Sequence, residues 1–248
     1  MWKSCAVVVY AGKLAGSLKK MGEGSRDAVE NVVRWAVQEA ARRGWVEDRP
    51  GLAEALTDFV RLLAKWNRVY NLTALEDPTE VAELHLLDSL AVAPWVPAGA
   101  RVLDVGAGAG FPGFPLAMAR PDVQVVLVDR TEKKVAFMKN AIARSSLRNA
   151  RPLHLRLEGK GKEDLGGPFD VVVSRAFAAP EVWLPFGAAY ARRGGKVIGM
   201  LGGRAPEVQE IGRAVGISER ALERVDYVLP SGARRGILVW VLEEEAAS

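Results

Sequence analysis

Hydrophobic residues recur at helical spacing through the first hundred positions of the chain. In segments 26–43 and 51–68 they fall three and four positions apart, which predicts two amphipathic helices. A third helix is predicted after Pro78, which suits a first helical turn, with Asp77 or Thr79 as its cap. The residues that this third helix presents are Val81, Leu84, His85, Asp88, Ser89 and Leu90.

The pattern changes at Arg101, where short runs rich in Val, Ile and Leu begin to alternate with helical stretches. Because these runs do not alternate with polar residues, we expect strands buried on both faces, as in a parallel sheet covered by helices. The last two runs have no helix between them and predict a hairpin, which places one antiparallel strand in the sheet. The runs are RVLDVG, VQVVLVD, PLHLRL, FDVVVSR, GKVIGML, RVDYVLP and GILVWVL.

These patterns divide the chain into three parts. Residues 1–24 lack a sustained period and are predicted to be an N-terminal extension, and residues 25–98 form a helical region that packs as a cap. Residues 99–248 form a Rossmann-like domain of the α/β class, in which a mostly parallel seven-stranded sheet ends in an antiparallel hairpin.

Composition narrows the functional classes. Hydrophobic residues make up 49% of the 248 positions, which is typical of a globular protein, and no apolar run approaches the roughly 20 residues that cross a bilayer. Lys13 interrupts the short apolar run near the start, which argues against a secretory signal. The single Cys5 excludes an intramolecular disulfide, and with only two histidines no metal site is expected.

The net charge of +4 and the pI of about 9.3 permit an anionic partner such as nucleic acid but do not require one. The lysine run at positions 133, 134 and 139 is typical of a solvated helix face. Charge therefore leaves the partner open.

A glycine-rich segment follows the first predicted strand and leads into a helix. Glycines let the backbone turn tightly and approach a ligand that a Cβ atom would block, and the N-terminus of the next helix offers unpaired N–H groups. The segment therefore predicts a cofactor site. Its candidate contacts are Asp104, Gly106, Ala107, Gly108, Gly110 and Phe111, with Asp129 at the end of the second strand.

Two cofactors compete for this site. The segment 108–113 matches the dinucleotide pattern GxGxxG, which is weak evidence alone. Asp104 favours S-adenosylmethionine, because a carboxylate opposes a pyrophosphate and attracts the cationic, amine-bearing end of that donor. Asp129 can accept hydrogen bonds from ribose hydroxyls of either cofactor. A glycine-rich turn with solvated acids is the structural alternative, and S-adenosylmethionine is the preferred interpretation.

Further motifs occur in order between positions 56 and 242. They are WNxxYNLTA from Trp66, HxxDSL from His85, LDVGAGAGFPG from Leu103, DxxxKKxxF from Asp129, then Arg156-x-Glu158, Ser174-Arg175-Ala176 and Leu229-Pro230. In this combination the chain resembles the bacterial 16S rRNA guanine-N7 methyltransferase family RsmG, also known as glucose-inhibited division protein B. The NLTA and HxxDSL motifs are the specific part, because all such methyltransferases share the glycine loop.

The resemblance implies a class I methyltransferase that uses S-adenosylmethionine to methylate guanine N7 in the 530 loop of 16S rRNA. It implies a monomer in the cytoplasm whose partner is this rRNA or the small-subunit particle, with no membrane and no metal. Donor contacts carried over besides the glycine loop are Arg156, Leu157, Glu158 and Arg175. The chain departs from the family at Leu201-Gly202, where a Lys-Gly pair is usual, and residues 1–24 match nothing in it.

Methylation of guanine N7 makes few demands on side-chain chemistry. N7 carries a lone pair and no proton, so the enzyme must align the base and exclude water but needs no general base. Cys5 lies in an unpatterned terminus, which argues against a cysteine adduct, and Ser174 to Phe177 replace the N/D-P-P-Y/F segment of amino-methyltransferases. Arg175 is therefore the candidate catalytic residue, orienting guanine O6 or a phosphate through its guanidinium.

Each candidate for target contact has a structural alternative. His85 and Asp88 share a helical face and either line the target pocket or, as we favour, pack the helix against the sheet. Arg175 either contacts the target or forms a salt bridge, and the ring of Phe177 either stacks on a base or belongs to the core. The Asn and Thr of the NLTA motif either line the pocket or cap a turn. The full set is Asn71, Thr73, His85, Asp88, Ser89 and Phe177.

Three functions remain open on the residues alone. The first is methylation of rRNA guanine N7, and the second is methylation of a small molecule or a protein by the same fold. The third is a non-catalytic protein that senses S-adenosylmethionine or a nucleotide. Dependence of methyl transfer on RNA separates the first two, and turnover separates both from the third.

Overall fold

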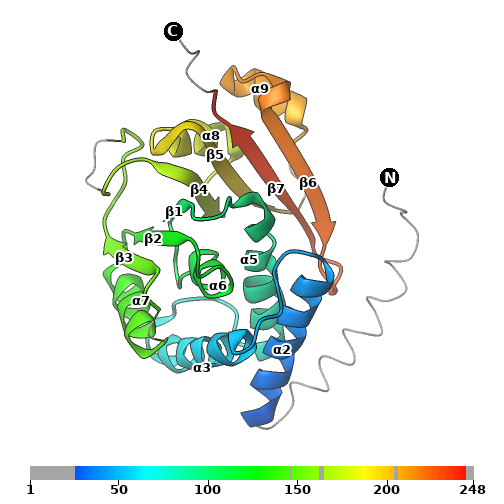
Figure 1. The fold of residues 1–248 in the computed structure, drawn as a ribbon, viewed down its shortest axis with the longest axis vertical. Helices are drawn as coiled ribbons and strands as arrows, with labels where there is room; N and C mark the ends of the chain where they lie inside the picture. Colours follow the sequence, from blue (N-terminus) through cyan, green and yellow to red (C-terminus); the bar gives the residue numbers. More distant parts are fainter. Residues whose placement is uncertain (1–25, 146, 162–164, 204–205, 244–248) are drawn as a thin grey trace.

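The computed structural model describes residues 26–145, 147–161, 165–203 and 206–243, so the extension predicted at residues 1–24 lies outside the described residues. Within them, one twisted sheet is covered by helices (Figure 1). The helices and helical turns are α2 (Arg26–Arg42), α3 (Leu52–Tyr70), α4 (Pro78–Glu80), η1 (Val81–Leu87), α5 (Asp88–Leu90), η2 (Ala93–Trp95), α6 (Gly113–Ala119), α7 (Glu132–Ser145), α8 (Pro180–Ala188), α9 (Val208–Val215) and η3 (Glu219–Ala221).

The sheet has the order β3-β2-β1-β4-β5-β7-β6. Strands β1 to β5 run parallel, and β7 runs antiparallel to both β5 and β6. The predicted Rossmann-like sheet with a terminal antiparallel hairpin is therefore confirmed. The strands are β1 (Arg101–Val105), β2 (Gln124–Asp129), β3 (Ala150–His154), β4 (Phe169–Arg175), β5 (Ala191–Gly202), β6 (Leu222–Val228) and β7 (Arg234–Val241).

Both faces of the sheet are buried, as the unalternated strands predict. Along β1, Val102 packs into the core beneath α3, α6 and α7, whereas Leu103 and Val105 pack into a second core beneath α8 and α9. No helix in the described ranges is both long and apolar enough to cross a membrane.

The helical region shares its core with the sheet domain. The ring of Phe59 in α3 stacks on Phe114 of α6 with centroids 5.0 Å apart, and Trp66 meets Phe137 of α7 edge-on at 5.7 Å. These aromatic contacts fix the cap over the helices that follow β1 and β2. The cap thereby stands beside the carboxyl ends of those strands, where open α/β sheets bind ligands.

The segment 78–90 differs from its prediction. Asp77 caps it through hydrogen bonds from the Thr79 and Glu80 N–H groups, and the segment is helical, as expected, but not α-helical throughout. Residues 81–87 form a π-helix, in which the Asp88 N–H reaches the Glu83 carbonyl. Tertiary hydrogen bonds hold this wider turn: the Ser231 N–H donates to the Glu83 carboxylate at 2.6 Å. Such turns are frequent at functional sites.

The loop after α3 is held by a buried side chain. Asn67 Oδ1 accepts hydrogen bonds from the Leu72 and Thr73 N–H groups at 2.7 and 2.9 Å. Asn71, which directly precedes these two residues, adopts the left-handed conformation, at φ 49°, and ends the helix. The asparagine is tolerant of this conformation, and the turn that follows carries Thr73 toward the sheet.

We expect Asn67→Ala to lower the free energy of unfolding by about 1–3 kcal/mol, because two backbone donors lose their buried acceptor. Thermal or urea denaturation measures the change. Asn140→Ala is the matched control, because the Asn140 oxygen accepts only an exposed bond from Arg144. Equal effects of the two substitutions would contradict the role given to Asn67.

Candidate functional site

The glycine loop folds over the end of β2. The N–H groups of Gly106 and Ala107 both donate to the Val128 carbonyl, at 2.8 and 3.0 Å. The next turn is held by Asp129, whose Oδ2 accepts the Gly108 N–H at 2.9 Å. The loop is therefore fixed in shape by β2 itself, independently of any ligand.

Two glycines of the loop allow neighbouring side chains to pack closely against the backbone, and a third leaves open space beside it. A Cβ atom on Gly110 would lie 2.2 Å from the Phe114 ring, and one on Gly113 would lie 2.7 Å from Asp104 Oδ2. At Gly108, where φ is +60°, the nearest atoms to such a Cβ are the Gly106 carbonyl at 3.9 Å and Lys134 Nζ at 4.0 Å. The backbone at Gly108 is thus open to a ligand.

Asp104 is a fully buried carboxylate near the end of β1, and only one of its two oxygens accepts a hydrogen bond from a described residue. Its Oδ2 accepts the Gly113 N–H at 2.8 Å, and its Oδ1 is buried with no hydrogen-bond partner among the described residues. Burial raises the pKa of Asp104 to about 7, although the Gly113 N–H and Arg175 act in the opposite direction. A buried oxygen of this kind fits a ligand that brings a cation or a donor.

Asp129 is also buried, but both of its oxygens are engaged, Oδ1 by the Thr131 N–H at 2.8 Å. Each carboxylate oxygen has a second lone pair, so Asp129 can still accept from a ribose hydroxyl. The end of β3 lies alongside, because the Leu155 N–H donates to the Asp129 carbonyl at 3.2 Å. This pairing places the segment 156–158 beside the loop.

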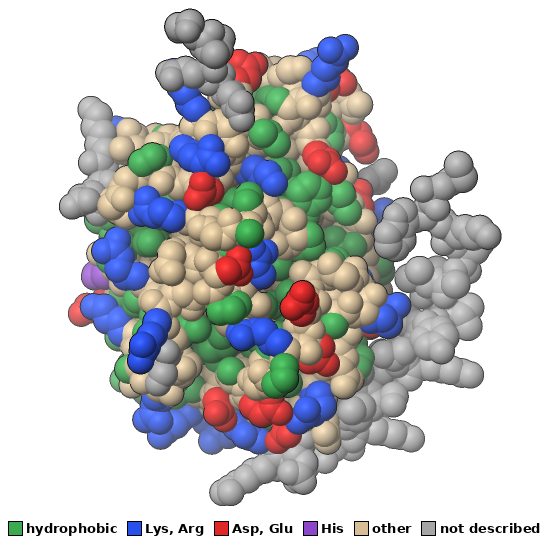
Figure 2. All heavy atoms as spheres, in the orientation of Figure 1, with side chains coloured by type: hydrophobic (Ala, Val, Ile, Leu, Met, Phe, Trp, Pro, Cys, Tyr) green, Lys and Arg blue, Asp and Glu red, His purple; other side chains and the backbone are tan. Residues whose placement is uncertain are grey.

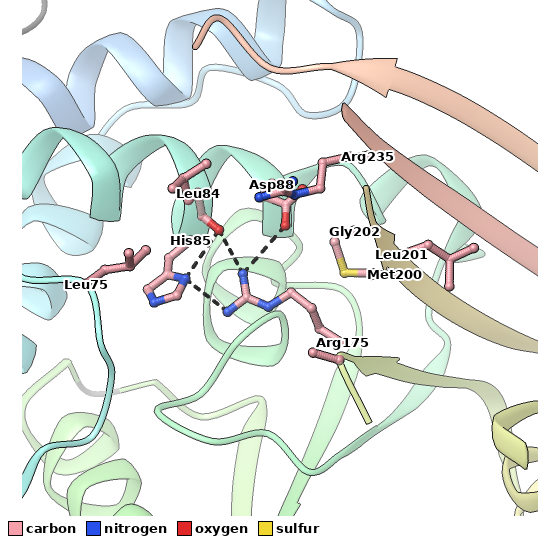
Figure 3. Close-up of a pocket in the computed structure, with 10 residues that line it drawn as sticks. Leu75, Leu84, His85, Asp88, Arg175, Met200, Leu201, Gly202 and Arg235 are labelled. Atoms are coloured by element: carbon pink, nitrogen blue, oxygen red, sulfur yellow. Dashed lines mark hydrogen bonds and ion pairs between the residues drawn. The ribbon is translucent and has the colours of Figure 1, made fainter. Parts of the chain in front are cut away.

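A pocket of about 390 Å³ opens between the π-helix and the ends of β4, β5 and β7 (Figure 3). Its lining combines apolar side chains with a histidine, a carboxylate and two guanidinium groups. The lining residues are Leu75, Leu84, His85, Asp88, Arg175, Ala176, Met200, Leu201, Gly202 and Arg235.

Arg175 extends from the end of β4 to the π-helix. Its Nη1 donates to the Leu84 carbonyl at 2.9 Å, and its Nη2 lies 3.1 Å from His85 Nδ1. The guanidinium also lies over the Phe111 ring, 5.3 Å from the centroid. One side chain from the sheet thus fixes the helix, the histidine and the glycine loop together.

Both ring nitrogens of His85 have polar neighbours. Nδ1 lies 3.1 Å from Arg175 Nη2 and 3.2 Å from the Leu84 carbonyl oxygen, and Nε2 lies 2.8 Å from Thr73 Oγ1. The ring stacks on Phe111 with the centroids 4.5 Å apart. Burial, with the positive charge of Arg175, lowers the pKa of His85 to about 3, so the ring is neutral near pH 7.

Asp88 joins two arginines at the back of the pocket. Its oxygens lie 3.6 Å from Arg175 Nη1 and 3.5 Å from Arg235 Nε, and Tyr227 donates to Oδ1 at 2.7 Å. Burial raises the pKa of Asp88, and the tyrosine and the two guanidinium groups offset this effect. Both ion pairs exceed the length of a strong hydrogen bond, so each guanidinium retains donors for another acceptor.

The family model for rRNA small subunit methyltransferase G (GidB) matches residues 52–226. A Myxococcus xanthus protein named Ribosomal RNA small subunit methyltransferase G is 44% identical over 182 residues, which cover 73% of this chain and 84% of that protein. A protein of the same name from Alkalilimnicola ehrlichii is 41% identical over 198 residues, covering 80% and 87%.

The chain belongs to the rRNA small subunit methyltransferase G family. The resemblance drawn from its motifs is thereby confirmed. A Bacillus cereus O-methyltransferase in complex with SAH matches with a TM-score of 0.51 and 20% identity over 74% of this chain and 90% of that chain. A putative O-methyltransferase from Klebsiella pneumoniae matches at 0.51 and 17%, over 84% and 96%. These distant structures share the fold alone.

The two motifs specific to the rRNA small subunit methyltransferase G family meet in the pocket, because Thr73 of the first bonds to His85 of the second. Other predicted residues lie elsewhere. Ser89 is buried and donates to the His85 carbonyl at 2.5 Å, and the exposed Asn71 ends α3. Phe111 is predicted to contact the donor, and its ring packs on His85, which leaves its backbone for that contact.

Phe177 is not part of the core. Its ring is 42% exposed, packs on Phe186 at 4.8 Å, and lies 3.4 Å from where a Gly106 Cβ would be. The left-handed Ala176, at φ 55°, separates it from Arg175. Of the other candidates, Arg156 is exposed, Leu157 packs into the second core, and Glu158 lies 2.6 Å from Lys160.

Sequence reasoning missed two members of the pocket cluster. Tyr227 and Arg235 lie on the terminal hairpin, far along the chain from Asp88. Only the pairing register of β5 with β7, which sets Gly202 opposite Arg235, brings this arginine to the pocket. No group of histidine, cysteine and acidic side chains suited to a metal ion occurs in the part of the chain that the structure describes.

The raised pKa of Asp104 predicts a pH dependence of stability. The unfolded carboxyl has a pKa near 3.9, so the folded chain binds this proton more tightly. The stabilisation is complete below about pH 4 and is lost as pH rises through about 7. We expect the free energy of unfolding of the native protein to fall over this range, relative to Asp104→Asn, by up to about 4 kcal/mol. Urea denaturation at several pH values measures it, and parallel profiles would contradict the assignment.

Proposed function

We propose that this protein transfers the methyl group of S-adenosylmethionine to N7 of a guanine in small-subunit rRNA. The observation that carries the proposal is the juxtaposition of an open glycine loop with a pocket built by Arg175, His85 and Asp88, in a chain of this family. The resemblance to a 16S rRNA methyltransferase family also leads us to propose the 530 loop as the target region.

The residues around the loop fit a donor with a cationic end. Asp104 Oδ1, which is buried and unpartnered among the described residues, suits the sulfonium or amino group. Asp129 suits the ribose hydroxyls, and the open backbone at Gly108 allows close approach. S-adenosylmethionine, when bound, supplies an electrophilic methyl group that needs no further activation.

The pocket fits a purine that is aligned but not deprotonated. Met200 and Leu201 offer an apolar surface for the ring, and the spare donors of Arg175 and Arg235 suit guanine O6 or a phosphate. Burial and the charge of Arg175 lower the pKa of His85 to about 3, so its ring is neutral and too weakly basic to serve as a general base. Guanine N7 requires no base, which agrees with this arrangement.

The proposed partner is the rRNA itself or the small-subunit particle. We propose that the protein binds it as a monomer in the cytoplasm. The presence of two arginines on one carboxylate leaves a net positive charge in the pocket, which favours an anionic polymer over a neutral small molecule. Gel filtration with light scattering checks the monomer.

The direct assay incubates the protein with methyl-labelled donor and separated 16S rRNA, 23S rRNA and small-subunit particles, and then maps the methylated base. We expect label at a guanine N7 of 16S rRNA only. Transfer to 23S rRNA, to a particle protein or to no RNA would contradict the proposal.

Asp129→Ala should weaken donor binding by about 1–3 kcal/mol, because the ribose hydroxyls and the Gly108 N–H lose an acceptor together. Calorimetry measures the affinity. Asp129→Asn, which keeps one acceptor oxygen, should lose less. Unchanged affinity in both variants, or tight binding of a dinucleotide by the native protein, would contradict the donor assignment.

Arg175→Lys should keep the charge beside Asp88 but lose the fork that spans the Leu84 carbonyl and His85. We expect the single-turnover methylation rate to fall at least about tenfold, while donor affinity stays near native, because alignment is lost. Arg192→Lys, at the far end of the sheet, is the control. A native rate in Arg175→Lys would remove Arg175 from the mechanism. Joint loss of melting temperature and donor binding would assign it a structural role.

A further inference from the structure

A basic surface lies where the end of α3 meets the start of α7 (Figure 1). We name it the α3–α7 surface. Figure 2 shows Lys and Arg side chains gathered along the lower left edge of the molecule, where these helices lie in Figure 1. Its exposed members are Lys65, Arg68, Tyr70, Arg130 and Lys133.

The positive charge of this surface is not neutralised by the protein. In the described part of the chain, no carboxylate lies within ion-pair distance of Lys65, Arg68 or Lys133. The arginines of α2 behave differently, because Arg34 pairs with Glu30 and Arg42 with Glu39. Cations clustered without carboxylate partners repel one another, and this repulsion destabilises the folded protein unless an anion binds nearby.

Helix electrostatics explains only half of the cluster. Arg68 lies in the last turn of α3, where a cation complements the helix dipole. Lys133 lies in the first turn of α7, where a cation is opposed by the dipole, and Glu132 is the favourable neighbour there. Cations therefore gather here from two helix ends, although only the end of α3 favours them. This arrangement points to an anion outside the protein.

An exposed aromatic ring completes the surface. Tyr70 is 42% exposed, and its ring lies 5.1 Å from that of Trp66, which supports it from below. Lys133 Nζ donates to the Tyr70 carbonyl at 2.7 Å, which joins the two helices. Three residues later Thr73 bonds to His85 in the pocket, so the surface and the pocket are linked by one short segment.

We propose that the α3–α7 surface binds the single-stranded RNA that flanks the target guanine, with Tyr70 stacking on a base and Lys65, Arg68 and Lys133 contacting phosphates. The inference rests on the proposed function. A single strand is favoured over a duplex because a stacking ring needs an unpaired base face. The combination of free cations and one exposed ring is the usual platform for such a strand.

The test compares two double variants that lose the same charge. Lys65→Ala/Arg68→Ala alters the surface, and Arg213→Ala/Arg220→Ala removes two exposed arginines at α9 and η3, at the opposite end of Figure 1. The probe is whichever of 16S rRNA and small-subunit particle the native protein methylates. We expect about tenfold weaker binding for the first variant at 0.1 M salt, and a salt slope shallower by about 1.4, or 0.7 for each lost contact.

Tyr70→Ala should weaken RNA binding by about tenfold or more, and Tyr70→Phe, which keeps the ring, should stay near native. In the surface variants to alanine we expect KM for RNA to rise while kcat and donor affinity are retained. Surface and control variants that lose equal affinity would overturn the α3–α7 surface and leave the proposed function standing. A native protein that neither binds nor methylates RNA would overturn both.

Discussion

The guanidinium of Arg175 is the contact on which the site depends. It begins at the end of a central strand and bonds to a helix carbonyl, to a histidine and to a carboxylate, and it covers the Phe111 ring of the glycine loop. Because these groups come from the helical region, the loop and the sheet, their relative placement is set by one side chain. Removal of this cation would leave buried polar groups without partners.

Burying two arginines, an aspartate and a tyrosine together is expensive. Replacing such clusters with apolar residues of similar volume is often neutral or stabilising, so stability alone is a weak reason to keep one. The cluster around Asp88 opens onto a pocket, and its ion pairs are loose enough to admit another acceptor. Asp104, whose carboxylate the charge of Arg175 stabilises, is likewise left with a buried oxygen unpaired among the described residues. Both features suit a site that is completed by its ligands.

Local patterns predicted the parts of the fold that local physics determines. Apolar runs located the strands, Asp77 and Pro78 located a helix start, and the missing helix before the last strand predicted the hairpin. The glycine loop was also predictable from the sequence, because its positive φ angles and close atomic contacts favour glycine over residues with a side chain. These features depend on neighbours in the chain.

The unpredicted features depend on contacts between distant segments. The π-helix is stabilised by a bond from Ser231, and Arg235 reaches the pocket through the register of β7 against β5. No spacing along the chain encodes either contact. The same holds for His85, whose Nδ1 lies 3.1 Å from Nη2 of Arg175, ninety residues further on. Sequence motifs identified several of the residues that form the site, and the structure shows which of them contact one another.

The central claim is that the pocket receives the target guanine while the glycine loop holds the donor. A crystal structure with S-adenosylhomocysteine and an RNA fragment containing the methylated site tests it most directly. The account predicts the guanine in the pocket against Met200 and Leu201, within reach of Arg175, with N7 facing the donor sulfur across the space of one methyl group. A guanine bound elsewhere, or N7 turned away from the sulfur, would contradict it.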